Sequence, residues 1–231
     1  MIDPKENIIT QDGRAYTPDR FHSMAILFTL SLAFLLLYSC KDPIVIDDNI
    51  IKIPAKNDTL NMNGIKPLKF GNVWKYLYKK YDSKGTLLTS GIVVDSVRKD
   101  TIIDKSRWFI TSMRDTVWQS NFPDGLRMSK IGSVPVIEWL EAKYPGLPGF
   151  TWQVESSQRN INIIDTLISV TAGSFMCYYY GDITNTPKGW EYSNIYYSAK
   201  VGLIKRETYV DETADVKYLS YSLELIDFTI K

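Results

Sequence analysis

Alternating aromatic and polar residues in the segment NVWKYLYKKY (residues 72–81) constrain the fold more than any other feature of the chain. In an extended strand, Trp74, Tyr76 and Tyr78 lie on one face, while two lysines and a leucine lie on the other. One apolar and one polar face are typical of an antiparallel sheet with a core on one side and water on the other. The turn residues DSKG (82–85) follow, so the sequence predicts a hairpin with residues 86–97.

Strand-like segments of this kind continue to the C-terminus. Runs rich in Tyr, Trp, Ile, Val and Thr alternate with Gly, Asp, Asn and Pro at intervals of roughly ten residues, which is the signature of an all-β domain. We predict this domain over residues 67–231, as a mostly antiparallel curved sheet that forms either an open barrel or a sandwich. Further strands are expected over residues 106–112, 115–121, 125–131, 151–157, 160–170, 174–181, 190–198, 202–210 and 215–228.

One segment does not show this strand-like pattern. SVPVIEWLEAKYPG (133–146) contains a run of good helix formers between Pro135 and Pro145-Gly146, which are helix start and stop signals. The sequence therefore predicts one short helix there.

An apolar run from Met24 to Tyr38 precedes the domain and is interrupted only by Thr29 and Ser31. It is short for a membrane span, which needs roughly 20 residues, and it fits the apolar region of a secretory signal peptide. The run ends in Leu37-Tyr38-Ser39-Cys40, which resembles the lipobox of bacterial lipoproteins.

This resemblance implies that the signal helix lies in a signal peptide of residues 1–39, and that Cys40 carries the acyl chains, such as palmitate, that hold the protein on a membrane. Lys41 after the cysteine favours the outer membrane over retention at the inner one, with the periplasmic face and the cell surface both open. The alternative is an uncleaved N-terminal anchor helix, and translation from Met24 instead of Met1 also stays open. Residues 40–66, which mix Pro, Asp and Asn with short Ile clusters, are expected to form a tether.

Composition excludes several kinds of chemistry. His22 is the single histidine, and it lies in the predicted signal peptide, so the mature chain would hold no Ser-His-Asp site and no zinc site with imidazole ligands. Cys177 would be the only cysteine besides Cys40, which leaves no internal disulfide, and its aromatic neighbours predict a small buried hydrophobe. The formal net charge of +1 gives no reason to expect nucleic acid as a partner, and we expect no metal and no cofactor.

Three further motifs carry a resemblance. They are FGNVWKYLY (70–78), ISVTAGSFMCYYY (168–180) and YYSAKVGLIKRETY (196–209). Together they resemble a group of uncharacterised bacterial secreted lipoproteins, although Ala199-Lys200 stands where that group has Pro-Gly. The resemblance implies an antiparallel β domain on a lipid anchor in the cell envelope and brings no catalytic residue.

For function, we predict a non-enzymatic interaction or structural module of the envelope, whose partner is an envelope protein, a lipid or a glycan. The alternative is a carrier of an apolar ligand in a concave sheet or a binder of carbohydrate, because exposed aromatic rings stack on sugars. Trp118, Trp139 and Trp190 are the first candidates for ligand contact.

A hydrolase that uses two carboxylates is a less favoured reading, because such chemistry needs no histidine. Its candidate residues are Glu138, Glu141, Asp95 and Asp165.

Overall fold

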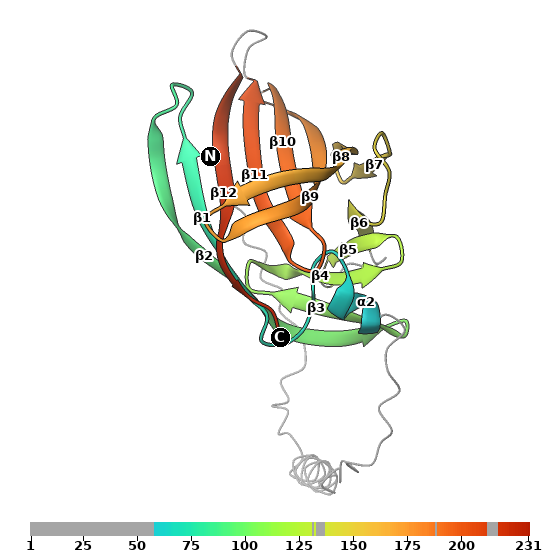
Figure 1. The fold of residues 1–231 in the computed structure, drawn as a ribbon. Coiled ribbons are helices and arrows are strands. Elements are labelled where there is room, and N and C mark those ends of the chain that lie inside the picture. Colours follow the sequence, from blue (N-terminus) through green and yellow to red (C-terminus); the bar gives the residue numbers. More distant parts are fainter. Residues whose placement is uncertain (1–57, 131, 133–136, 188, 212–216) are drawn as a thin grey trace, which may run out of the picture. The chain divides into compact units, whose positions relative to one another are not determined.

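The computed structural model describes residues 58–130, 132, 137–187, 189–211 and 217–231 (Figure 1). The predictions for the signal peptide, for Cys40 and for most of the tether lie outside these residues. One helix and twelve strands make up the described part: α2 (Asp58–Asn63), β1 (Val73–Tyr81), β2 (Leu87–Ile103), β3 (Ser106–Thr111), β4 (Arg114–Phe122), β5 (Gly125–Lys130), β6 (Glu138–Lys143), β7 (Thr151–Val154), β8 (Ser157–Val170), β9 (Gly173–Thr186), β10 (Gly189–Ser198), β11 (Gly202–Asp211) and β12 (Lys217–Thr229). In this part of the chain, no helix has the length and apolar character needed to span a bilayer.

All twelve strands form one antiparallel sheet in the order β6-β5-β4-β3-β2-β1-β12-β11-β10-β9-β8-β7. Neighbours in the sheet are neighbours in the sequence, except that β1 also pairs with β12. The sheet curls until its two end strands, β6 and β7, come together, so it is a nearly closed, open barrel rather than a sandwich (Figure 1). The prediction of an all-β, antiparallel curved sheet is confirmed.

The inner face of the sheet holds the core, and β1 shows how the alternation places it there. Trp74 and Tyr76 are completely buried, and both also satisfy their polar atoms. The indole Nε1 of Trp74 donates to the carbonyl oxygen of Val201 at 2.6 Å, and the Tyr76 hydroxyl donates to that of Leu203 at 3.2 Å. The predicted inward face of this strand is therefore confirmed.

The junction of β6 and β7 is held by side chains. The Trp152 indole on β7 donates to the carbonyl oxygen of Leu140 on β6 at 2.7 Å, and Arg159 on β8 donates to that of Glu141. Side-chain donors thus join the two end strands of the sheet.

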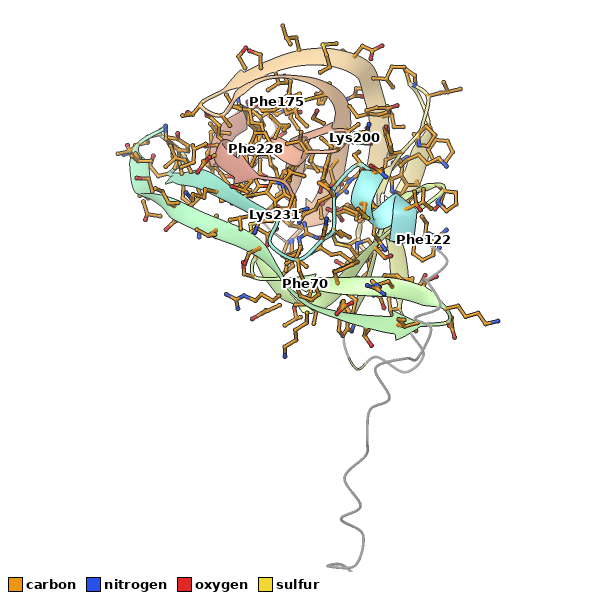
Figure 2. All side chains as sticks on the ribbon, turned by 60° about the horizontal axis from the view of Figure 1, so that its bottom comes forward. Phe70, Phe122, Phe175, Lys200, Phe228 and Lys231 are labelled. Atoms are coloured by element: carbon orange, nitrogen blue, oxygen red, sulfur yellow. The ribbon has the colours of Figure 1, made fainter. Side chains whose placement is uncertain are left out.

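The β8–β9 hairpin is long enough to reach across to β12. At its tip the Ala172 amide donates to the carbonyl oxygen of Leu225 at 3.2 Å, and the rings of Phe175 and Phe228 pack at 5.9 Å between centroids (Figure 2). Cys177 lies on β9, two residues after Phe175, and is completely buried. Burial raises the pKa of its thiol to about 12. Its predicted role as a small buried hydrophobe is confirmed.

The helix predicted within residues 133–146 is wrong. Glu138–Lys143 form strand β6, because pairing with β5 buries Glu141 and Ala142 on the sheet, where a helix would have no such partners. Within the described residues the one short helix is α2, which lies in the segment assigned to the tether. Ile65 and Asn61 are buried in the domain, so the packed structure begins before residue 67.

Candidate ligand-binding groove

A polar groove of about 270 Å³ lies over strands β8, β9 and β10. Three asparagines and two tyrosines make up half of the residues that line it. The residues that line it are Asn160, Asn162, Tyr179, Gly181, Asp182, Ile183, Tyr192, Ser193, Asn194 and Lys217. We refer to it as the Asn-Tyr groove.

Its centre is a gap in a row of side chains that runs across three strands. Asn160 on β8 pairs with Gly181 on β9, which pairs with Asn194 on β10. A Cβ on Gly181 would lie 2.7 Å from Oδ1 of Asn160 and 2.9 Å from Nδ2 of Asn162, which is too close. Glycine at this position therefore leaves room for the two amides to stand side by side, with Asn160 donating to Asn162.

Tyrosines flank the gap on the strands' outward face. The Tyr179 hydroxyl donates to Oδ1 of Asn194 at 2.9 Å, and the Tyr179 ring stacks on Tyr196 at 5.0 Å between centroids. Burial, followed by the neighbouring Tyr179, raises the pKa of Tyr196 to about 12, so this phenol stays neutral at physiological pH.

A cation closes the other end of the groove. Nζ of Lys217 lies 4.3 Å from the centroid of the Tyr192 ring and 5.3 Å from that of Tyr209. Both distances are within the range of a cation–π contact, so the ammonium group is held against the aromatic wall.

A cluster of four charges, three of them buried and Arg114 partly exposed, lies on the inner face behind the groove; we call it the Glu141 cluster. Its members are Arg114, Glu141, Arg159 and Asp182. Nη2 of Arg159 contacts Oδ2 of Asp182 at 2.7 Å, Nη1 of Arg159 lies 3.5 Å from Oε2 of Glu141, and Nη2 of Arg114 lies 3.2 Å from Oε1 of Glu141. Asp182 follows Gly181 and Arg159 precedes Asn160, so this cluster links from inside β8 and β9, two of the three strands that carry the groove.

The electrostatics of the cluster keep Glu141 ionised. Burial alone raises the pKa of its carboxyl group, but Arg114, Arg159 and Arg206 outweigh burial and hold the pKa at about 2. The same pairing raises the pKa of Arg159 against the cost of its own burial.

A second buried ion pair lies elsewhere in the interior. Nζ of Lys66 contacts Oδ2 of Asp95 at 2.8 Å and Oε1 of Gln119 at 3.2 Å, and the Met113 amide donates to Oδ1 of Asp95. Burial raises the pKa of Asp95, but Lys66 and these hydrogen bonds bring it below its ordinary value. This pair attaches the segment after α2 to the inside of the sheet.

The four carboxylates proposed for a hydrolase are not brought together as an open site. Asp95 and Glu141 are buried in separate ion-paired clusters, while Glu138 and Asp165 are exposed on β6 and β8. Among the described residues, no group of three or more His, Cys, Asp or Glu side chains is placed to hold a metal ion.

The three candidate tryptophans lie on three strands and do not meet. Trp118 on β4 stands in one cross-strand row with Ser129 and Glu138, whereas Trp139 stands in the next row, so the two point to opposite faces. Trp139 packs against the core and donates to Oε2 of Glu141 at 3.4 Å. Trp190 is the second residue of β10 and is 46% exposed.

Of these three residues, Trp190 is the one beside the groove. Counted along β10, it shares a face with Tyr192, Asn194 and Tyr196. The asparagines and Gly181 were not singled out from the sequence. Their one local signal is the Asn-x-Asn spacing of residues 160–162, which places both amides on one face of a strand.

A second, more apolar hollow of about 210 Å³ lies between α2 and β3. It is lined by Asn61, Met62, Leu68, Lys69, Phe70, Arg107 and Phe109.

No protein-family model and no curated protein matches this sequence. Two solved structures are similar to it. One is a candidate exported protein with a YmcC-like fold from Bacteroides fragilis, at 16% identity, and the other is a candidate lipoprotein from Parabacteroides distasonis, at 17% identity. Each match has a TM-score of 0.42 and covers 72% of this chain and 99% of the other.

Proposed function

We propose that this protein is a non-enzymatic carbohydrate-binding domain of the bacterial cell envelope. The observation that carries the proposal is the Asn-Tyr groove, in which three asparagine amides and two tyrosines surround the gap at Gly181.

The chemistry of these side chains suits a sugar. Each amide offers one acceptor oxygen and two donor hydrogens, which matches hydroxyl groups that both donate and accept hydrogen bonds. Tyrosine adds a flat apolar ring, against which the C–H face of a pyranose packs, and a polar hydroxyl at its edge. Trp190, on the same face of β10 and half exposed, would extend this aromatic surface to a neighbouring sugar unit.

The alternative of an apolar ligand inside the sheet finds less support. The interior is filled by large buried side chains such as Trp74, Tyr76 and Tyr180 and by the Glu141 cluster. The apolar hollow beside α2 measures about 210 Å³. Its lining includes Asn61, Lys69 and Arg107, so polar and charged groups share its wall with the apolar side chains.

The hydrolase alternative is also less favoured. A general acid works best with a pKa near the working pH, whereas the pKa of Glu141 is held at about 2 by its arginines. Asp95 is occupied by its contact with Lys66. These carboxylates have a structural role in the interior, which supports a protein that binds without catalysis.

The cellular setting of the proposal comes from the sequence. An acylated Cys40 would place the domain on the outer membrane, where periplasmic or surface glycans are within reach. The proposed partners are thus the membrane, through the lipid anchor, and an envelope glycan.

The proposal is tested by glycan-array screening of the full chain in detergent, followed by calorimetry with the best oligosaccharide. Gly181→Ala places a methyl group against the two amides, and we expect it to weaken binding about tenfold, the loss of roughly one good polar contact. Gly91→Ala is the matched control, because it is also in a strand and its Cβ would meet a single flexible side chain, Tyr78, at 2.9 Å. Absence of any glycan ligand, or equal affinity for both variants and the wild type, would overturn the proposal.

A further inference from the structure

The first part of strand β2 has a free edge. β2 runs from Leu87 to Ile103, and β1 pairs with it over residues 87–96, but β3 pairs with it only from Val97 onward. Ser112 reaches the end of the edge, where its hydroxyl donates to the carbonyl oxygen of Val94 at 2.8 Å. Among the described residues, no strand except β1 pairs with residues 87–93.

This edge is apolar and carries no charge. Its sequence, LLTSGIVV (87–94), has no acidic or basic residue. Leu88 is 65% exposed, Ile92 64% and Val94 46%. Edge strands are usually protected by charged residues, proline or bulges, because their unpaired backbone groups attract other strands. Here the one irregularity in the pairing of this segment with β1 lies at the hairpin tip, opposite Lys80 and Tyr81.

Two kinds of partner would bury these side chains, and the backbone distinguishes them. A lipid bilayer would cover the leucine and isoleucine side chains, but hydrocarbon leaves edge N–H and C=O groups without hydrogen bonds, at a cost of several kcal/mol each. An added strand covers the side chains and pairs the backbone at the same time. The edge therefore fits a strand better than a membrane.

We propose that this strand is β2 of a second copy of the chain, antiparallel across a twofold axis. In such an isologous contact the same segment faces itself, so it must be self-complementary. With the axis at Ser90, the middle of the free stretch 87–93, Leu88 of one copy faces Ile92 of the other, so the two most exposed apolar side chains of the edge meet. The absence of charge on this segment removes like-charge repulsion across the axis.

The cations around this edge do not oppose this arrangement, because Lys84 of one copy would lie opposite Ser96 of the other and Arg98 opposite Asp82. Lys79 and Lys80 lie on β1, so lysines of the two copies would be separated by three strand spacings of about 4.8 Å, or about 14 Å. This separation exceeds the Debye length of about 8 Å at physiological ionic strength. The resulting sheet would continue from one copy into the next without a break.

The test is the oligomeric state of the full chain in detergent, measured by light scattering, together with hydrogen exchange of the edge amides. We expect the wild type to dimerise and Ile92→Glu, which places a carboxylate beside the axis in both copies, to be monomeric. Ile102→Glu is the matched control, because Ile102 is 55% exposed on the same strand but lies where β3 already pairs with it, opposite Arg107. This control variant should remain dimeric.

Hydrogen exchange separates this dimer from association through another part of the chain. Amides of residues 87–94 should exchange at least tenfold more slowly in the wild-type dimer than in Ile92→Glu. A wild type that stays monomeric over the accessible concentrations, an Ile92→Glu variant that still dimerises, or a dimer whose edge amides remain unprotected would each overturn the proposal.

Discussion

Replacing Glu141 by glutamine should destabilise the domain by about 3 kcal/mol at neutral pH. Holding the pKa of the carboxyl group at about 2, against an ordinary value of 4.5, favours its ionised form by about 3 kcal/mol, at about 1.4 kcal/mol per pKa unit. Loss of one partner from a buried ion pair costs a similar amount, about 3–5 kcal/mol, because the remaining charge stays buried without compensation. Here the charges left behind belong to Arg114 and Arg159.

The pH dependence gives a sharper test than the magnitude at one pH. The pKa of Glu141 is lower in the folded than in the unfolded chain, so its stabilisation is complete above the unfolded value of about 4.5 and is lost as pH falls towards 2. We therefore expect the free energies of unfolding of wild type and Glu141→Gln to differ at pH 7 and to converge near pH 2. At that pH the carboxyl group is about half protonated in the folded chain and fully protonated in the unfolded chain, so little of its stabilising contribution remains.

Urea denaturation followed by tryptophan fluorescence between pH 2 and 7 measures both quantities. Glu138→Gln is the control on the same strand, since Glu138 is exposed and its nearest cation, Arg127, is 3.6 Å away. Exposed pairs contribute at most about 1 kcal/mol, so this variant should unfold nearly as the wild type does. If Glu141→Gln has wild-type stability at pH 7, or if the difference between them does not shrink on acidification, the cluster does not act as described.

Three further predictions concern other parts of the interior. Cys177, whose pKa is raised to about 12 by burial, should resist alkylation at pH 8 in the folded protein and react once urea unfolds it, as read by peptide mass mapping; modification of the folded chain at the unfolded rate would contradict its burial. Lys66→Met should cost about 3 kcal/mol of unfolding free energy, measured by urea denaturation at pH 7, because it leaves Asp95 buried without its cation, and an unchanged midpoint would argue against the pair. Trp152→Phe should cost about 1 kcal/mol through the lost hydrogen bond to Leu140 and should speed hydrogen exchange in β6 and β7 more than in β1; uniform exchange would show that the junction of the end strands is held by other contacts.

Much of the sheet was predictable because its strands obey local rules. The alternation around Trp74 and the turn at residues 82–85 need no information from distant residues, and both are found as predicted. The segment 133–146 failed for the opposite reason. Its helix-forming composition is a weak preference, and pairing with β5 and the burial of Glu141 against Arg159 outweigh it.

The groove could not be predicted from local sequence rules in the way the strands could. Its side chains come from β8, β9 and β10, and they meet only through the register that pairs Asn160 with Gly181 and Gly181 with Asn194. A tryptophan near a turn can be recognised in the sequence as a candidate for stacking on a ligand, and Trp190, one of three such candidates, lies beside the groove. An asparagine gains that meaning only when its neighbours on other strands are known.

The pairing of β1 with β12 determines when the domain can become stable. β1 and β12 are the first and last strands in the sequence, although they lie in the middle of the sheet. Beside them, the backbone amide of Lys231 donates to Oδ1 of Asn72, which lies 159 positions earlier in the chain. During synthesis, almost the whole domain must therefore be translated before β12, which pairs with the strand that carries Trp74 and Tyr76, leaves the ribosome. Until then the growing chain exposes the aromatic face of the β1–β2 hairpin, so a stop only a dozen residues early would yield a product for chaperones and proteases rather than a shortened domain.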